Sequence, residues 1–243
     1  QMCIRDSMTS CPDANFLQVV SPLKALQRLA ERHREAFDIP VVGITGSNGK
    51  TVVKEWLYQL LSPEKNVTRS PRSYNSQIGV PLSVWNLDER SEVGLFEAGI
   101  SEPGEMEALQ SVIQPTIGVF TCLGDAHQEN FTSYEQKCLE KLKLFKDAKV
   151  LVYDMDDARV VGCVNRSAFK GEYFAWSRQR RDVPLYIASV EKREAETVVS
   201  YIYKGKEAAC SIPFIDEASL ANSVSCLAVC LHLGMSPETI AAR

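Results

Sequence analysis

Short extended segments alternate with stretches of helical periodicity along the first two thirds of the chain. Five segments are typical of strands: an apolar run that begins at Val41, and residues 66–68, 93–97, 116–121 and 150–154. Helical patterns, with apolar residues at every third or fourth position, lie between or before them at 23–30, 53–61, 81–85, 103–113 and 134–146. Strands that alternate with helices predict a parallel, doubly wound α/β sheet.

The pattern changes after about residue 170. Four runs, at 173–176, 185–190, 197–203 and 207–212, are interpreted as strands, with Lys204-Gly205 as a hairpin turn. Helical periodicity returns at 219–233, and a further helix start follows at Ser236. The complete pattern predicts a mostly parallel, doubly wound sheet with an antiparallel β-rich extension.

Composition narrows the class of protein. The 243 residues are 45% apolar and 24% charged, as in an ordinary soluble globular protein with a sizeable core. The net charge of −4, without any Lys/Arg block, gives no reason to expect a nucleic-acid partner. No apolar run approaches the length that spans a membrane. The eight cysteines form no C-x-x-C pair, which fits a reducing cytoplasm rather than a disulfide framework.

A glycine-rich segment follows the first strand and opens a helix. It reads Gly46-Ser47-Asn48-Gly49-Lys50-Thr51. The backbone N–H groups and the dipole at a helix N-terminus favour an anion, a lysine there can reach terminal phosphates, and a threonine hydroxyl can bind Mg²⁺. We expect this P-loop to bind a nucleotide phosphate; the alternative is an ordinary glycine-rich turn. The general P-loop pattern has a glycine where this chain has Ile44.

Two further groups follow strands that should end at the same edge of the sheet. Glu97 ends one strand, and His127 lies in the loop after the next. Ligands of open α/β sheets bind outside the carboxyl ends of the strands. Because Mg²⁺ prefers hard oxygen ligands, Thr51 and Glu97 are its natural partners. His127 taken alone has an alternative interpretation as a surface or capping residue.

Taken together, these motifs resemble those of the Mur ligase superfamily, whose phosphate loop reads T-G-x-x-G-K-[ST]. Four further features follow the loop in the order in which the family has them. They are Y-N-x-x-I-G-V-P at 74–81, E-x-G from Glu97 with Gly104-Glu105, H-x-E-x-F from His127, and Lys141. The resemblance covers about residues 20–243 and implies the central ATPase domain of such a ligase. The sequence around Glu97 is similar to that of family members that are fused to an alanine racemase.

The resemblance implies a role for each matching residue. Lys50 would hold the phosphates of ATP, while Thr51, Glu97 and His127 would bind Mg²⁺. Lys141 matches a lysine that many members carry as a carbamate beside the metal, so Lys50, His127 and Lys141 are the expected catalytic residues. The alternative for Lys141 is a solvated surface lysine, because the same segment carries other cations: Lys137, Lys143, Lys146 and Lys149.

Two asparagines are also expected near the nucleotide. Asn75 matches a polar position of the family's loop close to the nucleotide or the metal, with a simple turn residue as the alternative. Asn222 matches the second asparagine of an H-N-x-x-N helix start near the adenine. Ala218 and Ser219 replace the first two residues of that pattern in this chain.

The resemblance further implies an activity and its substrates. The implied enzyme is an ATP- and Mg²⁺-dependent amide ligase of cell-wall precursor synthesis. It would add D-alanyl-D-alanine to UDP-N-acetylmuramoyl-tripeptide through an acyl phosphate. Two alternatives stay open: another Mur-type ligase, such as a muramyl amino-acid ligase or folylpolyglutamate synthase, and a non-ligase P-loop nucleotide-binding module.

The expected domain organisation follows from the same comparison of motifs. Residues 1–14 are interpreted as a non-native or disordered leader, and residues 15–40 as a lead-in helix at the end of a missing N-terminal domain. Residues 41–243 are interpreted as the central ATP-binding ligase domain, with the C-terminal domain missing. Because the family completes its active site from those other domains, we expect the fragment alone to be inactive.

Overall fold

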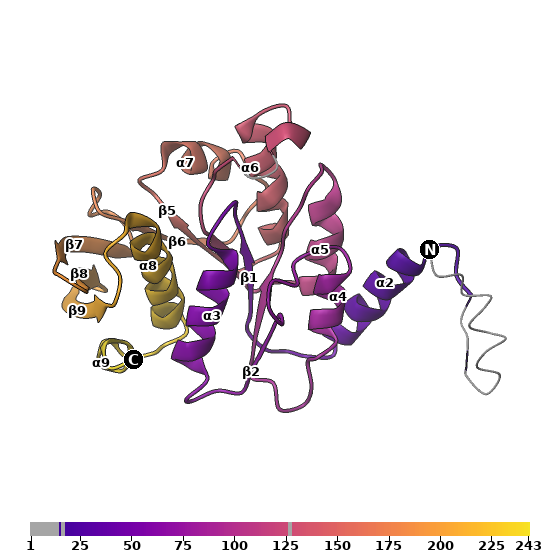
Figure 1. Cartoon of the computed structure of the whole chain (residues 1–243), viewed down its shortest axis with the longest axis horizontal. Helices are drawn as coiled ribbons and strands as arrows, with labels where there is room; N and C mark the ends of the chain where they lie inside the picture. Colours follow the sequence, from indigo (N-terminus) through magenta and orange to yellow (C-terminus); the bar gives the residue numbers. More distant parts are fainter. Residues whose placement is uncertain (1–14, 16–17, 126–127) are drawn as a thin grey trace.

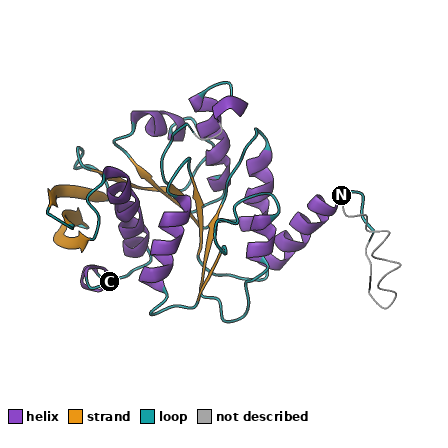
Figure 2. Cartoon of the chain, viewed as in Figure 1, coloured by secondary structure: helices purple, strands orange, loops and turns teal. Residues whose placement is uncertain are grey.

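A single mixed sheet with helices on both faces organises the protein (Figures 1 and 2). The computed structural model describes residue 15, residues 18–125 and residues 128–243. The strand order is β2-β3-β1-β4-β5-β6-β7-β8-β9. The strands are β1 (Val41–Thr45), β2 (Val67–Arg69), β3 (Val93–Glu97), β4 (Ile117–Phe120), β5 (Val150–Asp154), β6 (Glu172–Ser177), β7 (Leu185–Lys192), β8 (Thr197–Tyr203) and β9 (Lys206–Ile212).

The sheet is parallel from β2 to β7 and antiparallel from β7 to β9. The predicted parallel sheet with an antiparallel extension is therefore confirmed. The expectation that residues 173–176 belong to the antiparallel part is wrong, because they lie in β6, which pairs in parallel with β5. The reason is a helical crossover, α7 (Ala158–Val164), which returns the chain in the direction of β5.

Alternate residues of the strands face two separate cores. In β1, Val41 packs on one face, while Val42 and Ile44 pack on the other. The first face is covered by α2 (Pro22–Arg34), α4 (Gly79–Val84), α5 (Glu105–Ile113), α6 (Tyr134–Leu142) and α7. The second is covered by α3 (Lys50–Leu61), α8 (Glu217–His232) and α9 (Pro237–Ala241), and Figure 1 shows α3 beside α8. Burial on both faces explains why the central strands are apolar at nearly every position.

The helices follow the periodicity with local differences. The segment 134–146 divides into α6 and a 3₁₀ turn at Lys143–Phe145, and a second 3₁₀ turn lies at Gln128–Asn130. Helix α4 begins at Gly79, two residues before the expected Pro81. Helix α7 has no counterpart in the predicted pattern, and its N-cap Asp157 accepts the backbone N–H groups of Arg159 and Val160. Within the described ranges, none of the helices combines the length and apolarity needed to cross a membrane.

The strand order reverses at β1, which pairs with β3 on one side and β4 on the other. In open α/β sheets such a reversal opens a crevice at the carboxyl ends of the strands. The P-loop leaves β1 at this edge, Glu97 is the last residue of β3, and residues 121–125 follow β4. The topology therefore brings segments from three separate parts of the sequence to one place.

Candidate active site

The loop between β1 and α3 has a backbone conformation that favours glycine at two positions. Gly46 and Gly49 have φ angles of 148° and 83°, values that residues with a Cβ rarely adopt. A Cβ at Gly46 would collide with the Thr121 hydroxyl, and one at Gly49 would collide with the side-chain amide of Asn222. The loop is therefore packed between the end of β4 and helix α8, and Gly49 caps α3.

The same loop is held by bonds to the segment that follows β4. The backbone N–H of Ser47 donates to the carbonyl of Cys122 over 2.9 Å, and its hydroxyl donates to the carbonyl of Gly124 over 3.0 Å. The Thr121 hydroxyl donates to the carbonyl of Asn48. These hydrogen bonds to the segment after β4 fix the shape of the loop.

Lys50 lies at the first position of α3 and folds back over the loop. Its Nζ donates to the carbonyls of Gly46 and Ser47 over 3.0 and 3.2 Å. Burial lowers the pKa of Lys50, and the nearby charge of Glu97 acts in the opposite direction. Both carbonyls are neutral, so the ammonium keeps a cationic charge that an anion could neutralise.

Thr51 and Glu97, predicted as metal partners, meet in the structure. The Thr51 hydroxyl donates to Oε2 of Glu97 over 2.9 Å, and the Glu97 side chain is fully buried. A hydroxyl and a carboxylate are hard oxygen donors, so the pair fits Mg²⁺. Among the described residues there is no cluster of three or more His, Cys, Asp or Glu side chains that could hold a metal. An ion here would take its remaining ligands from phosphate oxygens and water, as Mg²⁺ commonly does.

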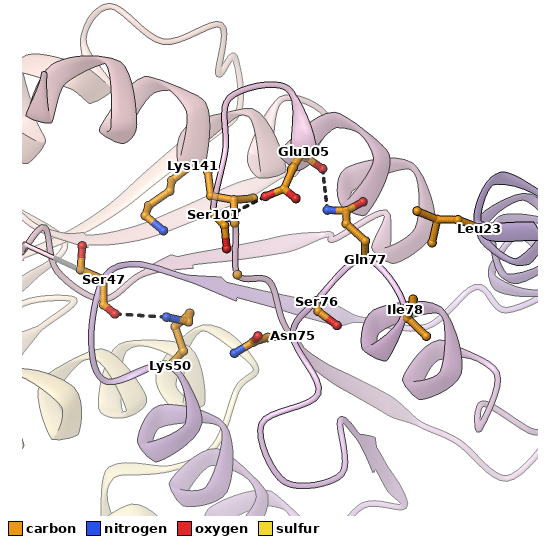
Figure 3. Close-up of a pocket in the computed structure, with 12 residues that line it drawn as sticks. Leu23, Ser47, Lys50, Asn75, Ser76, Gln77, Ile78, Ser101, Glu105 and Lys141 are labelled. Carbon is orange, nitrogen blue, oxygen red and sulfur yellow. Dashed lines mark hydrogen bonds between the residues drawn. The ribbon is translucent and has the colours of Figure 1, made fainter. Parts of the chain in front are cut away.

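Lys141 faces the P-loop across a cavity of about 350 Å³ that Ser47, Lys50 and Asn75 also line. Figure 3 shows Lys141 and Lys50 reaching into this space from opposite sides. The Lys141 side chain is 3% exposed, which contradicts the alternative of a surface lysine. The pKa of Lys141 is lowered to about 8. Burial is the largest cause, and the positive charges of Lys50 and Lys137 act in the same direction. Within the described part of the chain, no hydrogen bond or ion pair reaches its ammonium group.

Lys137 lies one turn before Lys141 on α6 and is also buried. The expectation that it is a solvated cation is wrong, because its side chain has no exposed surface. Its ammonium donates to the carbonyl of Gly124 and lies 5.0 Å from the centre of the Tyr134 ring. Since Gly124 also accepts from Ser47, Lys137 helps to hold the segment that supports the P-loop.

The remaining predicted residues occupy three different situations. Asn75 lines the cavity, and its backbone carbonyl accepts the N–H of Gly99 over 2.8 Å. Asn222, on α8, lies against Gly49. His127 lies outside the described residues. The structure thus brings the P-loop, Glu97, Asn75, Lys141 and Asn222 to one edge of the sheet.

Sequence reasoning assigned no individual role to several residues in or near this site. Lys54 is fully buried on α3, and its Nζ lies 3.3 Å from Oε1 of Glu97. On the far wall, Glu105 accepts the N–H of Ser101 over 2.6 Å, and Gln77 donates to the Glu105 carbonyl over 3.1 Å (Figure 3). A signal existed for Lys54, because it interrupts the buried face between Val53 and Leu57.

A strand, a glycine-rich loop and a helix at the switch point of a doubly wound sheet define a P-loop α/β domain. The chain belongs to the Mur ligase family, because residues 44–230 match the Mur ligase middle domain. Two similar proteins are both UDP-N-acetylmuramoyl-tripeptide–D-alanyl-D-alanine ligases. The one from Bacillus subtilis is 28% identical over 225 residues, which is 90% of this chain and 47% of that protein. The one from Borreliella burgdorferi is 30% identical over 231 residues, which is 93% of this chain and 48% of that protein.

Solved structures show the same fold. A MurF ligase from Thermotoga maritima, in complex with ADP, superposes with a TM-score of 0.81 at 26% identity. The alignment covers 93% of this chain and 53% of that one. A MurF from Acinetobacter baumannii superposes with a TM-score of 0.85 at 22% identity, over 95% of this chain and 51% of that one. The chain thus spans about half the length of the curated relatives it matches.

Proposed function

We propose that this chain is the nucleotide-binding part of an ATP-dependent amide ligase that joins D-alanyl-D-alanine to UDP-N-acetylmuramoyl-tripeptide. The observation that carries the proposal is the pair of lysines, the half-buried Lys50 and the buried Lys141, on opposite walls of one cavity beside the P-loop. Such a cavity suits a nucleotide whose terminal phosphate lies beside Lys50 and the loop N–H groups. The relatives carry this activity in their names, and one related structure holds ADP.

The reaction divides into two displacements. An oxygen of the tripeptide carboxylate attacks the γ-phosphorus of ATP, the bond from that phosphorus to the β–γ bridging oxygen breaks, and ADP leaves. The amine of D-alanyl-D-alanine then attacks the acyl carbon, the carbon–oxygen bond to phosphate breaks, and the amine loses a proton. The chain's contribution is positioning and charge neutralisation by the loop N–H groups and Lys50.

Thr51 and Glu97 would hold Mg²⁺ in this proposal, together with His127. When bound, the ion supplies charge neutralisation to the phosphates. Asn75 would face the nucleotide or the metal from the loop before α4, and Asn222 would approach the adenine from α8. Asn222 contacts the loop at Gly49, which is consistent with that role.

Lys141 would act as a carbamate, as the family resemblance implies. The Lys141 ammonium must first lose one proton, because only the neutral amine attacks CO₂. Formation of the nitrogen–carbon bond then opens one C=O bond of CO₂ to a carboxylate and releases a second proton, so a cation is exchanged for an anion. The Lys141 side chain lies among cations, near Lys50 and Lys137. A negative group at that point would be stabilised by its surroundings, whereas the ammonium is not.

The proposal extends to the organisation of the whole enzyme. Residues 41–243 would be the central domain, and residues 15–40 would lead in from an N-terminal domain. A C-terminal domain would complete the ATP site, so this segment alone would not catalyse the reaction. The enzyme would act in the cytoplasm, which the scattered cysteines without a C-x-x-C pair favour.

The test begins with nucleotide binding by this chain. A fluorescent ADP analogue with Mg²⁺ should bind the unaltered chain, and Lys50→Ala should weaken binding roughly 10–100-fold through loss of charge-assisted hydrogen bonds. Lys24→Ala removes an exposed lysine on α2 and is the matched control. Equal binding by both variants would overturn the assignment of Lys50.

A second assay addresses the substrates. A longer protein that carries this domain with both flanking domains should release phosphate from ATP only when both proposed substrates are present. Stimulation by a single amino acid in place of D-alanyl-D-alanine would identify another ligase of the family. Nucleotide binding without any substrate-stimulated turnover would favour a non-ligase nucleotide-binding module.

A further inference from the structure

A chain of alternating charges runs from the protein surface to the P-loop. It starts at Arg69, which pairs with Oε2 of Glu55, and Oε1 of Glu55 lies 3.1 Å from the ammonium of Lys54. Lys54 in turn lies 3.3 Å from Oε1 of Glu97, and Oε2 of Glu97 accepts the Thr51 hydroxyl over 2.9 Å. Lys54 and Glu97 are both fully buried, whereas Glu55 and Arg69 are partly exposed.

Lys54 also holds the loop that forms one wall of the cavity. Its ammonium donates to the carbonyl of Ser70 over 2.8 Å and to the carbonyl of Arg72, which has a φ of 49°. This loop leads to Asn75, whose carbonyl accepts the N–H of Gly99 just after β3. One side chain therefore contacts the carboxylate beside the P-loop and the segment that carries Asn75.

We propose that Lys54 is a positioning residue: it orients the Glu97 carboxylate toward Thr51 and holds the loop of Asn75 against the same site. The inference rests on the proposed function, because it treats Thr51 and Glu97 as the place where the metal of a nucleotide is held. A carboxylate that is fully buried needs a cation or several donors, and the ammonium of Lys54 lies 3.3 Å from Oε1 of Glu97. Without Lys54, Oε1 of Glu97 would lose this partner.

Lys54 also opposes a metal by charge repulsion, and the Mg²⁺ dependence of nucleotide binding decides which of the two effects is larger. Its charge is shared between two carboxylates, Glu55 and Glu97, so the chain from Arg69 to Glu97 is neutral as a whole. Removal of Lys54 leaves one net negative charge in a buried place and an undirected carboxylate. Loss of such a supporting partner typically lowers metal affinity 10–100-fold.

The first experiment measures how Mg²⁺ changes the affinity of this chain for a fluorescent ADP analogue. In Lys54→Met we expect affinity with Mg²⁺ to fall roughly 10–100-fold, while affinity without Mg²⁺ changes less than about threefold. The control is Arg34→Met, which removes another buried cation whose guanidinium donates to the carbonyls of Ile113 and Phe37, far from the carboxyl ends of the strands. Arg34→Met should lower the melting temperature and leave the effect of Mg²⁺ on the affinity for the ADP analogue unchanged.

A second variant guards against failure of Lys54→Met to fold. Lys54→Met/Glu97→Gln leaves no unpaired buried carboxylate, and it is compared with Glu97→Gln. If Lys54 holds the loop, the N–H of Gly99 should exchange with solvent at least about tenfold faster in the double variant. Equal exchange rates would overturn this part of the inference.

The outcomes separate the inference from the proposed function. An unchanged or stronger Mg²⁺ effect in Lys54→Met would show that Lys54 does not position Glu97, and would overturn the inference. If Mg²⁺ leaves ADP binding by the unaltered chain unchanged, the proposed metal site fails instead. The exchange rate of Gly99 then still decides whether Lys54 holds the loop.

Discussion

Replacement of Gly49 by alanine tests how tightly the P-loop is packed against α8. The φ of 83° costs a residue with a Cβ about 1–2 kcal/mol. The new methyl group would also collide with the side-chain amide of Asn222, and overpacking of this kind costs about 1–3 kcal/mol. We therefore expect the free energy of unfolding to fall by about 2–5 kcal/mol in Gly49→Ala.

The chain offers a matched control for the backbone part of this cost. Gly205 has a φ of 75°, and a Cβ there meets nothing within 4 Å. Gly205→Ala should therefore lose only about 1–2 kcal/mol. The collision with Asn222 should add nothing in the double variant Gly49→Ala/Asn222→Ala. Its loss of unfolding free energy, after the effect of Asn222→Ala alone is subtracted, should therefore equal that of Gly205→Ala.

Urea unfolding followed by circular dichroism measures these free energies, and binding of a fluorescent ADP analogue measures the state of the loop. Gly49→Ala should bind at least about tenfold more weakly, because the loop N–H groups move away from the phosphate, whereas Gly205→Ala should bind normally. Equal unfolding free energies for Gly49→Ala and Gly205→Ala would refute the reasoning. They would mean that Asn222 swings aside at no cost.

Two further substitutions test buried polar groups elsewhere. Burial raises the pKa of Asp154 from 3.8 to about 6, so the carboxylate destabilises the folded state increasingly as pH rises through that window. Solvent screening reduces the effect because Asp154 is partly exposed, and Asp154→Asn should raise the free energy of unfolding more at pH 8 than at pH 4.5. Urea titrations at both pH values check this, and an equal gain at each would contradict it. The hydroxyl of Tyr201 is buried and has no hydrogen-bond partner in the described part of the chain. Tyr201→Phe should therefore be neutral or gain about 1 kcal/mol in urea unfolding, and a clear loss would reveal a partner.

Local signals were sufficient for the parts of the fold that depend on neighbouring residues. The P-loop could be predicted because its glycines, Lys50 and Thr51 lie within one short segment between a strand and a helix. The placement of Glu97 followed from the rule that parallel strands end at one edge. Non-local pairing was harder, because the sequence of β6 is compatible with either direction and only the crossover through α7 decides it.

Burial of charged residues was the other limit of sequence reasoning. Lys137 occurs among exposed lysines such as Lys146, and neither composition nor periodicity separates it from the solvated ones. Lys141 is distinguished only by its place in the family's order of motifs. The burial of Lys54 likewise depends on Glu97 and on two carbonyls that lie far away in sequence. Such partners are supplied by the tertiary structure, so composition and periodicity do not reveal them.

The position of Lys50 over its own loop has a consequence for discrimination among ligands. Its ammonium already has two carbonyl partners, at Gly46 and Ser47, so a ligand gains from Lys50 only by drawing it away from them. A neutral group offers bonds no stronger than those given up, whereas a phosphate oxygen offers charge-assisted bonds of roughly twice the strength. If Lys50 binds the phosphates as proposed, it should therefore favour charged ligands by this exchange of partners rather than by shape, and adenosine should compete far less well than ADP for the site.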